Sequence, residues 1–269
     1  MEFLQPQNGK PFWFSLIPSE FFWESINFFI PRSWAVSDIT QGAEVVNLDR
    51  KTEIPYTLSI MVITYQGGAF VKVQFGDITI AVNPVSKDSK LKASRFGADI
   101  ALVSVNHVDF CGVDQVSFGE KNAFAITGPG EYEIKDVFIK GFKSDSQYGG
   151  EPRLNTIYTV NLENMNMCFL GGHATKELPS DVAEALDDID ILFVPIGADG
   201  VLAPSDAYKL AVKLEPKLIV PLYFGNTAAL KVFLKEAGEE AQKPQDKLTL
   251  KKKDLDGKEA DVVVLEPQS

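Results

Sequence analysis

The chain of 269 residues contains only two histidines and two cysteines. One of the histidines, His107, stands two positions before Asp109 in the run Val105-Asn-His-Val-Asp-Phe110. An imidazole and a carboxylate are ligands that zinc accepts, and zinc held in this way can acidify a bound water for hydrolysis. A catalytic zinc has three protein ligands, so this pair alone makes an incomplete centre.

The pair has a second interpretation that needs no metal. A loop that follows a strand can keep Asp109 as an acceptor for backbone amides, with His107 in the same hydrogen-bonded turn. The other histidine, His173, follows Gly171-Gly172 and could face a cleft as a third ligand or a binding contact. The short ligand set favours the hydrogen-bonded turn, and an altered metal centre of His107, Asp109 and His173 is the alternative.

Composition limits the classes of partner. The net charge of −11 argues against nucleic acid, because phosphate binding needs a basic surface. The densest lysine run, Lys251-Lys-Lys253, lies beside two aspartates and indicates a solvated strand end or turn. Cys111 and Cys168 share no metal or redox spacing, which fits small core residues in a reduced cytosol, and we expect a cytoplasmic protein.

Residues 1–60 differ from the rest of the chain. They hold all three tryptophans, Trp13, Trp23 and Trp34, together with several prolines. We predict an aromatic- and proline-rich extension that packs on the following domain or is not part of the native domain, with Met61 as an alternative start. Contact of residues 11–30 with a membrane interface is a weaker alternative, because the flanks lack the cationic residues of interfacial helices.

From Met61 onward, short β-branched runs alternate with turns, and after about residue 180 helical periodicity alternates with apolar runs. Hairpins followed by helix–strand units predict an α/β/β/α sandwich for residues 61–269, in which two mixed sheets pack face to face between helices. The expected strands are 62–65, 70–75, 78–82, 100–104, 123–126, 137–139, 156–162, 167–170, 189–195, 217–221 and 262–265, and the expected helices are 180–186, 204–214 and 227–237.

Several segments together resemble the metallo-β-lactamase fold, in the branch of small zinc-dependent hydrolase-like proteins related to the ascorbate-6-phosphate lactonases. They are Ile63-Thr-Tyr-Gln-Gly-Gly-Ala-Phe70 with Ile78-Thr-Ile-Ala-Val-Asn-Pro84, Ala98 to Gly112, Thr127 to Tyr158, Cys168-Phe-Leu-Gly-Gly-His-Ala174, and Asp190 to Phe224. The resemblance covers nearly all of residues 61–269 and implies the same sandwich fold.

The resemblance also implies where a metal would bind. Of the family's motif Thr-His-x-His-x-Asp-His, this chain keeps His107 and Asp109, whereas Val105 and Phe110 stand at the other two ligand positions. Neither replacement carries a lone pair for a metal. The remaining ligand positions correspond to Gly68, Ser144, Gly172 and Tyr223, and a further family aspartate is replaced by Asn83.

We therefore predict a metallo-β-lactamase-like domain without a cofactor, which acts as a non-catalytic binding or scaffold protein for an unidentified small molecule or protein. We expect Tyr223 to fill the vacated cavity beside Phe110 and Val105. A zinc-dependent hydrolase of phosphoesters or lactones, with an altered centre around His107, Asp109 and His173, is the alternative.

Overall fold

Alternation of buried and half-buried side chains along the first strand shows how the sequence builds the core. The computed structural model describes residues 60–92 and 94–268. In β1 (Met61–Gly67), Met61, Ile63 and Tyr65 are buried and the intervening residues are partly exposed. This period of two places one face of the strand against a second sheet, as expected for a sandwich.

The first sheet has the strand order β12-β1-β2-β3-β4-β5. Its other strands are β2 (Phe70–Phe75), β3 (Ile78–Val82), β4 (Ile100–Leu102), β5 (Phe124–Ile126) and β12 (Leu248–Leu250). β3, β4 and β5 run parallel, whereas β12, β1, β2 and β3 are antiparallel neighbours. Gly76, at a φ of 54°, turns the β2–β3 hairpin as the Gly-Asp step predicts.

The second sheet has the strand order β13-β11-β10-β9-β8-β7-β6. Its strands are β6 (Gly130–Ile134), β7 (Val137–Ser146), β8 (Arg153–Leu162), β9 (Met165–Phe169), β10 (Ile191–Pro195), β11 (Leu218–Leu222) and β13 (Asp261–Val262). Here β6 to β9 form antiparallel hairpins, and β9, β10, β11 and β13 run parallel. Both sheets are therefore mixed.

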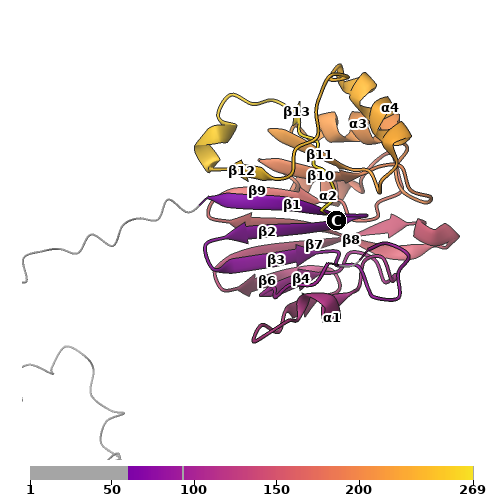
Figure 1. Ribbon diagram of the computed structural model, residues 1–269. Coiled ribbons are helices and arrows are strands. Elements are labelled where there is room, and N and C mark those ends of the chain that lie inside the picture. Colours follow the sequence, from indigo (N-terminus) through magenta and orange to yellow (C-terminus); the bar gives the residue numbers. More distant parts are fainter. Residues whose placement is uncertain (1–59, 93, 269) are drawn as a thin grey trace, which may run out of the picture. The chain divides into compact units, whose positions relative to one another are not determined.

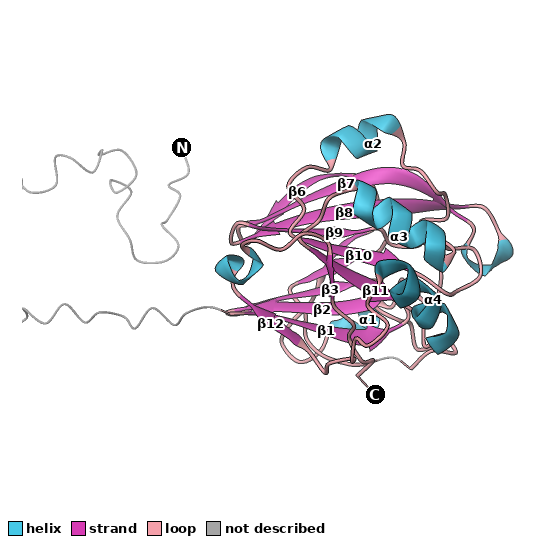
Figure 2. Cartoon of the chain, turned by 90° about the horizontal axis from the view of Figure 1, so that it is seen from above, coloured by secondary structure: helices cyan, strands magenta, loops and turns pink. Residues whose placement is uncertain are grey.

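The two sheets pack face to face and one continuous apolar core lies between them (Figures 1 and 2). The helices are α1 (Val113–Val116), α2 (Ser180–Ala185), α3 (Pro204–Lys213) and α4 (Thr227–Ala237). Figure 2 shows α2 outside the second sheet, and α3 contacts β10 of that sheet. Two short 3₁₀ turns, Tyr148–Gly150 and Lys252–Leu255, complete the described elements. The predicted α/β/β/α sandwich is confirmed.

Several element predictions differ from the structure. The sequence missed β6, β12 and α1, and β7 continues to Ser146, well beyond the expected 137–139. The strand expected at 262–265 is reduced to Asp261–Val262. Glu131 and Glu133 give β6 little strand propensity. They are tolerated there because β6 is an edge strand and both side chains are exposed.

A buried aspartate directly precedes a parallel strand in each sheet. Asp99, next to β4, accepts the backbone amide of Thr79 and pairs with two lysines, Lys121 at 2.7 Å and Lys135 at 2.5 Å. Asp190, next to β10, accepts the backbone amide of Asn166 and also pairs with two lysines. Each carboxylate thereby joins segments that are far apart in the sequence.

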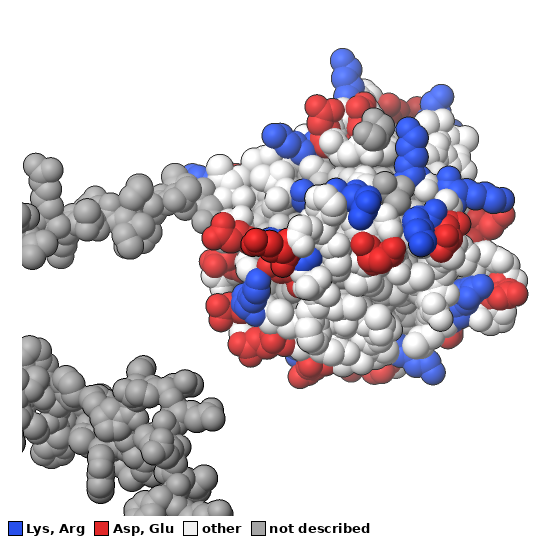
Figure 3. All heavy atoms as spheres, turned by 60° about the horizontal axis from the view of Figure 1, so that its bottom comes forward, with Lys and Arg blue, Asp and Glu red and all other residues white. Residues whose placement is uncertain are grey.

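The two lysines of Asp190 are Lys217, at 2.8 Å, and Lys252, at 2.5 Å. The solvated turn expected for Lys251–Lys253 is therefore only partly right, because Lys252 reaches a fully buried carboxylate. On the face shown in Figure 3, basic and acidic side chains are interspersed. That face carries no continuous basic surface.

Cys168 is buried and Cys111 half-buried, and both are free thiols. Within the described residues, no helix is long and apolar enough to cross a membrane. The predictions made for residues 1–59 lie outside the described part of the chain.

Candidate functional site

An aromatic cluster occupies the loops where the sequence predicts the metal-binding position. It consists of the buried residues Ala69, Val105, Phe110 and Tyr148, with Phe224 packed against them. The Phe110 and Tyr148 rings meet edge to face with centroids 4.9 Å apart, and the Phe224 centroid lies 5.8 Å from that of Tyr148 and 6.4 Å from that of Phe110. We call these five residues the aromatic plug.

Asp109 is held at the side of the aromatic plug by two hydroxyl groups. The Tyr148 hydroxyl donates to Asp109 Oδ2 at 2.7 Å, and the Ser89 hydroxyl donates to Oδ1. Burial, together with the hydrogen bond and the negative charge of Asp109, raises the pKa of Tyr148. The phenol therefore stays protonated at neutral pH and remains a donor to the carboxylate.

His107 is tied to the same turn through its Nδ1 atom. That atom accepts the backbone amide of Asp109 at 3.2 Å and lies 3.5 Å from Asp109 Oδ2. The imidazole also packs edge to face on the Tyr148 ring, with centroids 5.0 Å apart. A hydrogen-bonded turn is present, but its pattern differs from the expected one: the amide of Asp109 donates to His107, and the Asp109 carboxylate accepts hydroxyls.

The turn that carries Tyr148 is fixed by Arg153. The Arg153 Nε donates to the Tyr148 carbonyl at 3.2 Å, and Nη1 donates to the Asn106 carbonyl at 3.1 Å. The Tyr148 amide donates to the Ser146 hydroxyl at 3.1 Å. These bonds connect the start of β8 with the loop after β4 and hold Tyr148 over Phe110.

Gly172 lies directly under the aromatic plug. A Cβ atom added at this position would lie 2.9 Å from Val105 Cγ2, 3.0 Å from Ser146 Oγ and 3.5 Å from Phe110 Cζ. Contacts under 3.0 Å force neighbours to move, and the nearest one belongs to a fully buried valine. The space that an aspartate would need at this position is filled by Val105 and Phe110, which stand where the family resemblance places histidines.

Gly68 shows a similar replacement. Its φ is 62°, and an added Cβ would lie 2.8 Å from Leu91 Cδ1 and 3.9 Å from Phe224 Cδ1. A larger residue at position 68 would be strained by the left-handed backbone and would also clash with the Leu91 side chain.

Ser144 is buried on β7 but belongs to a different hydrogen-bond network. Its hydroxyl accepts from Asn155 Nδ2 at 2.8 Å, and Asn155 Oδ1 accepts the Gly172 amide at 2.8 Å. Ser146, two residues later on the same strand, lies closer to Gly172 and Tyr148. The sequence offered no signal that separates these two serines.

His173 is fully buried, and its Nε2 lies 3.1 Å from the Thr175 hydroxyl. Its Nδ1 has no hydrogen-bond partner among the described residues. Burial lowers its pKa, so the ring is neutral at pH 7. No hydrogen bond or ring contact in the described chain joins His173 to His107 or Asp109.

Tyr223 was expected beside Phe110 and Val105, and the structure places Phe224 there instead. The Tyr223 hydroxyl donates to the Leu265 carbonyl at 3.3 Å, and its ring packs on Tyr65 with centroids 5.5 Å apart. Phe224 has a φ of 50°, which changes the direction of the chain after β11. Neither Phe224 nor Tyr148 was singled out in the sequence.

The residues present do not fit a metal ion. Residues 60–92 and 94–268 contain no group of three or more His, Cys, Asp or Glu side chains that could hold one. The two retained ligand types are also engaged, since both Asp109 oxygens accept hydroxyls and His107 Nδ1 accepts an amide. This pair supplies two side chains at most, which is fewer than the three protein ligands of a catalytic zinc.

Comparison with known proteins shows which family this chain resembles in sequence. The model of the beta-lactamase superfamily domain matches residues 62–223. A UPF0173 metal-dependent hydrolase of Listeria welshimeri is 27% identical in an alignment of 197 positions that covers 61% of this chain and 85% of that protein. A UPF0173 metal-dependent hydrolase of Anoxybacillus flavithermus is 26% identical in an alignment of 195 positions that covers 61% of this chain and 86% of that protein.

Solved structures agree with the sequence comparison. A protein of the metallo-β-lactamase superfamily from Thermotoga maritima matches with a TM-score of 0.62 and 26% identity, over 77% of this chain and 100% of that one. A protein from Parabacteroides distasonis matches with a TM-score of 0.55 and 19% identity, over 77% and 94% of the two chains. The second likeness concerns the fold alone.

Proposed function

We propose that this protein, which belongs to the beta-lactamase superfamily domain family, is a non-catalytic member whose metal-binding site has been replaced by the aromatic plug, and that it acts by binding. Its curated relatives carry the name metal-dependent hydrolase, so the proposal is that this chain keeps their fold without their chemistry. The fold alone does not decide between the two, because function depends on the residues of the site.

The observation that carries the proposal is the packing at Gly172. A bridging carboxylate at this position would need space that Val105 and Phe110 already fill. Both of these residues are fully buried, and they occupy positions where the family resemblance places histidines. An apolar plug of this kind removes ligands and also excludes the water that a hydrolase would activate.

The alternative is a metal-dependent hydrolase with an altered centre of His107, Asp109 and His173. Asp109 gives it little support, because each carboxylate oxygen already accepts a protein hydroxyl and a metal could use only the remaining lone pairs. His173 adds no support, since no contact connects it to the other two residues within the described chain. The named relatives favour this alternative, and an experiment must decide between them.

The deciding experiment is elemental analysis of the full-length protein purified without chelator, followed by thermal unfolding with EDTA and with added zinc. We expect less than about 0.1 metal ion per chain and a melting temperature that neither treatment changes. His107→Ala serves as the matched variant. It should leave the metal content at background and change stability only slightly, because His107 is partly exposed.

Stoichiometric zinc, manganese or iron that His107→Ala abolishes would contradict the proposal. It would instead support the hydrolase, and phosphodiester and lactone substrates would be the first to test. A metal-free protein that is well folded would support a binding function and direct the search to partners.

A further inference from the structure

A second feature of the molecule lies away from the aromatic plug, on the outer side of the second sheet. A hollow of about 560 Å³ lies between α2 and α3. We call it the α2–α3 groove. We propose that it is a docking site for a basic amphipathic helix of a partner protein. This proposal does not depend on whether the chain binds a metal.

The lining of the α2–α3 groove is apolar at its base. Leu186 and Leu210 are buried, and Leu178 and Leu214 are half-buried. α2 has only six residues, so it covers little of the surface beside α3. The leucines come from both sides of the hollow, and the apolar stripe of a third helix would bury the parts that are still exposed.

The rim of the α2–α3 groove is acidic. Glu184, Asp187 and Glu215 are exposed, and their carboxylates form no ion pair or side-chain hydrogen bond within the described chain. Asp188 also lines the hollow, with Lys217 at 3.7 Å. Lys213 is the one lysine among the lining residues. This excess of negative charge is complementary to lysine or arginine on the flanks of a helix.

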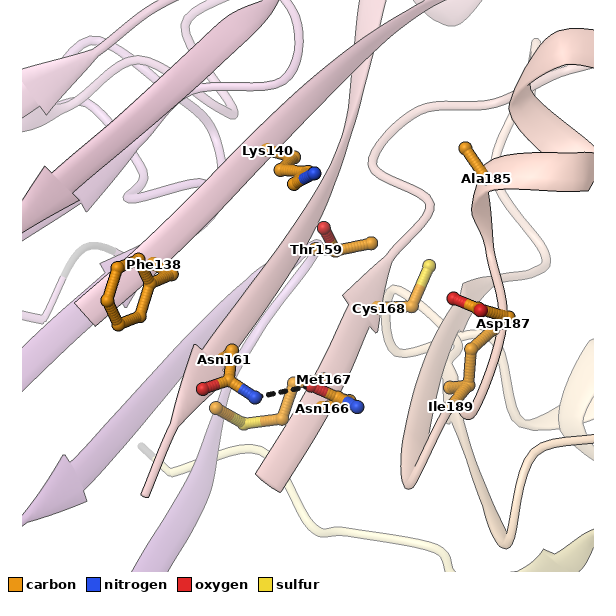
Figure 4. A pocket seen from close by; sticks show the side chains of 10 residues that line it. All are labelled: Phe138, Lys140, Thr159, Asn161, Asn166, Met167, Cys168, Ala185, Asp187 and Ile189. Atoms are coloured by element: carbon orange, nitrogen blue, oxygen red, sulfur yellow. Dashed lines mark hydrogen bonds between the residues drawn. The ribbon is translucent and has the colours of Figure 1, made fainter. Parts of the chain in front are cut away.

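Another hollow borders the α2–α3 groove near the end of α2. A second hollow of about 190 Å³ shares Asp187 with the first and lies over β7, β8 and β9. Figure 4 shows Phe138 and Asn161 beside each other on neighbouring strands, and these residues are paired in register. Phe138 is 51% exposed, so an apolar ring is available where the end of a docked segment would lie.

A second copy of this chain fits the groove less well. The chain carries a net charge of −11, and its approach to an acidic rim would be opposed by repulsion between like charges. A small ligand would cover the leucines but would leave the carboxylates on opposite sides of the hollow without partners. A helix with an apolar stripe between basic flanks satisfies both features at once.

The test uses a synthetic helical peptide of about 18 residues, with leucine at positions i, i+3, i+4 and i+7 and lysine elsewhere, following the helix-in-groove pattern. Binding to the full-length protein is measured by fluorescence anisotropy at about 0.15 M salt, where long-range attraction between charges is screened. A peptide of the same composition with scrambled order lacks the apolar stripe. It reports binding that is due to charge alone.

Two double variants of equal charge separate the groove from the rest of the surface. E184K/D187K reverses two rim carboxylates, and E239K/E240K reverses two exposed carboxylates after α4 as the matched control. We expect a loss of at least about tenfold in affinity for the first variant and less than about twofold for the second, because close charge pairs contribute most. The scrambled peptide should bind at least about tenfold more weakly than the amphipathic one.

Equal losses in both variants, equal binding of the scrambled peptide, or no saturable binding would each overturn the proposal. Circular dichroism of the two variants establishes that they are folded before affinities are compared. A negative result here leaves the metal-content experiment unaffected, so the two proposals can fail separately.

Discussion

Replacing Gly172 by aspartate restores the side chain that the family resemblance places there, and it provides the strictest test of the aromatic plug. The new Cβ would begin 2.9 Å from Val105 Cγ2 and 3.0 Å from Ser146 Oγ. The carboxylate would have to extend further into a region that Phe110 and Val105 fill. In a chain that holds a metal, the same substitution would add a ligand.

The expected loss of stability has two parts. Overpacking of a well-packed core costs about 1–3 kcal/mol. An unpaired buried carboxylate adds about 3–5 kcal/mol, as judged from buried ion pairs that have lost one partner. The sum, about 4–8 kcal/mol, approaches the whole free energy of unfolding of a typical domain, about 5–15 kcal/mol. Gly172→Ala carries only the first part and should cost about 1–3 kcal/mol.

Urea unfolding followed by circular dichroism, with EDTA and then with zinc, measures these differences. Gly128→Asp is the matched control, because an added Cβ there meets no atom within 4 Å. It should change the free energy of unfolding by less than about 0.5 kcal/mol, as surface substitutions usually do. The reasoning is refuted if Gly172→Asp is as stable as the parent protein, or if stoichiometric zinc restores its stability.

Three further predictions concern single groups. Tyr148→Phe keeps the ring but removes the hydroxyl that donates to Asp109, and it should lower the free energy of unfolding in urea by about 1.5–3 kcal/mol. Burial raises the pKa of Asp99, but hydrogen bonds from Lys121 and Lys135 outweigh this effect and lower the pKa to about 2. The folded state therefore binds this proton less readily than the unfolded state. Stability from Asp99 should therefore be complete above about pH 4 and be lost as the pH falls towards 2, and Asp99→Asn should flatten this part of the urea-measured profile. Burial lowers the pKa of His173 below 6.5, so the unfolded state binds a proton on this ring more readily than the folded state. The free energy of unfolding should therefore fall as the pH drops below about 6.5. His173→Gln should reduce the pH dependence of the free energy of unfolding in this range.

The sheets were largely predictable because their signals are local. β2 and β3 have the expected bounds, since β-branched residues alternate on both sides of a Gly-Asp turn. α4 also has its expected bounds, and Gly238 ends it in the left-handed conformation. β6 was missed because only Tyr132 and Ile134 alternate with its two glutamates, and glutamate is depleted in strands.

The composition of the site was harder to predict than its position. The replaced ligand positions indicated that an apolar pocket was present, but not which side chains fill it. Tyr148 lies in a 3₁₀ turn beside Gly149 and Gly150, where no periodicity indicates which way a side chain points. Phe224, and not Tyr223, faces the site because of a left-handed backbone conformation that a single sequence does not reveal.

The two buried carboxylates, Asp99 and Asp190, belong to one local arrangement that the fold uses twice. Asp99 and Asp190 each directly precede a parallel strand, and each accepts the amide of the second residue in the neighbouring strand, Thr79 or Asn166. The backbone amides of these aspartates donate back to the same two residues, at 2.8 and 2.9 Å. The same unit of two parallel strands therefore occurs once in each sheet.

The likeness of the two units extends to the charges around each carboxylate. The strand pairs β3–β4 and β9–β10 differ in sequence, yet the carboxylate, the reciprocal backbone hydrogen bonds and the two lysines are present in both. In both sheets, a buried carboxylate and two lysines therefore fix the start of a parallel strand, whereas the loop that carries Val105 and Phe110 of the aromatic plug follows the other end of β4.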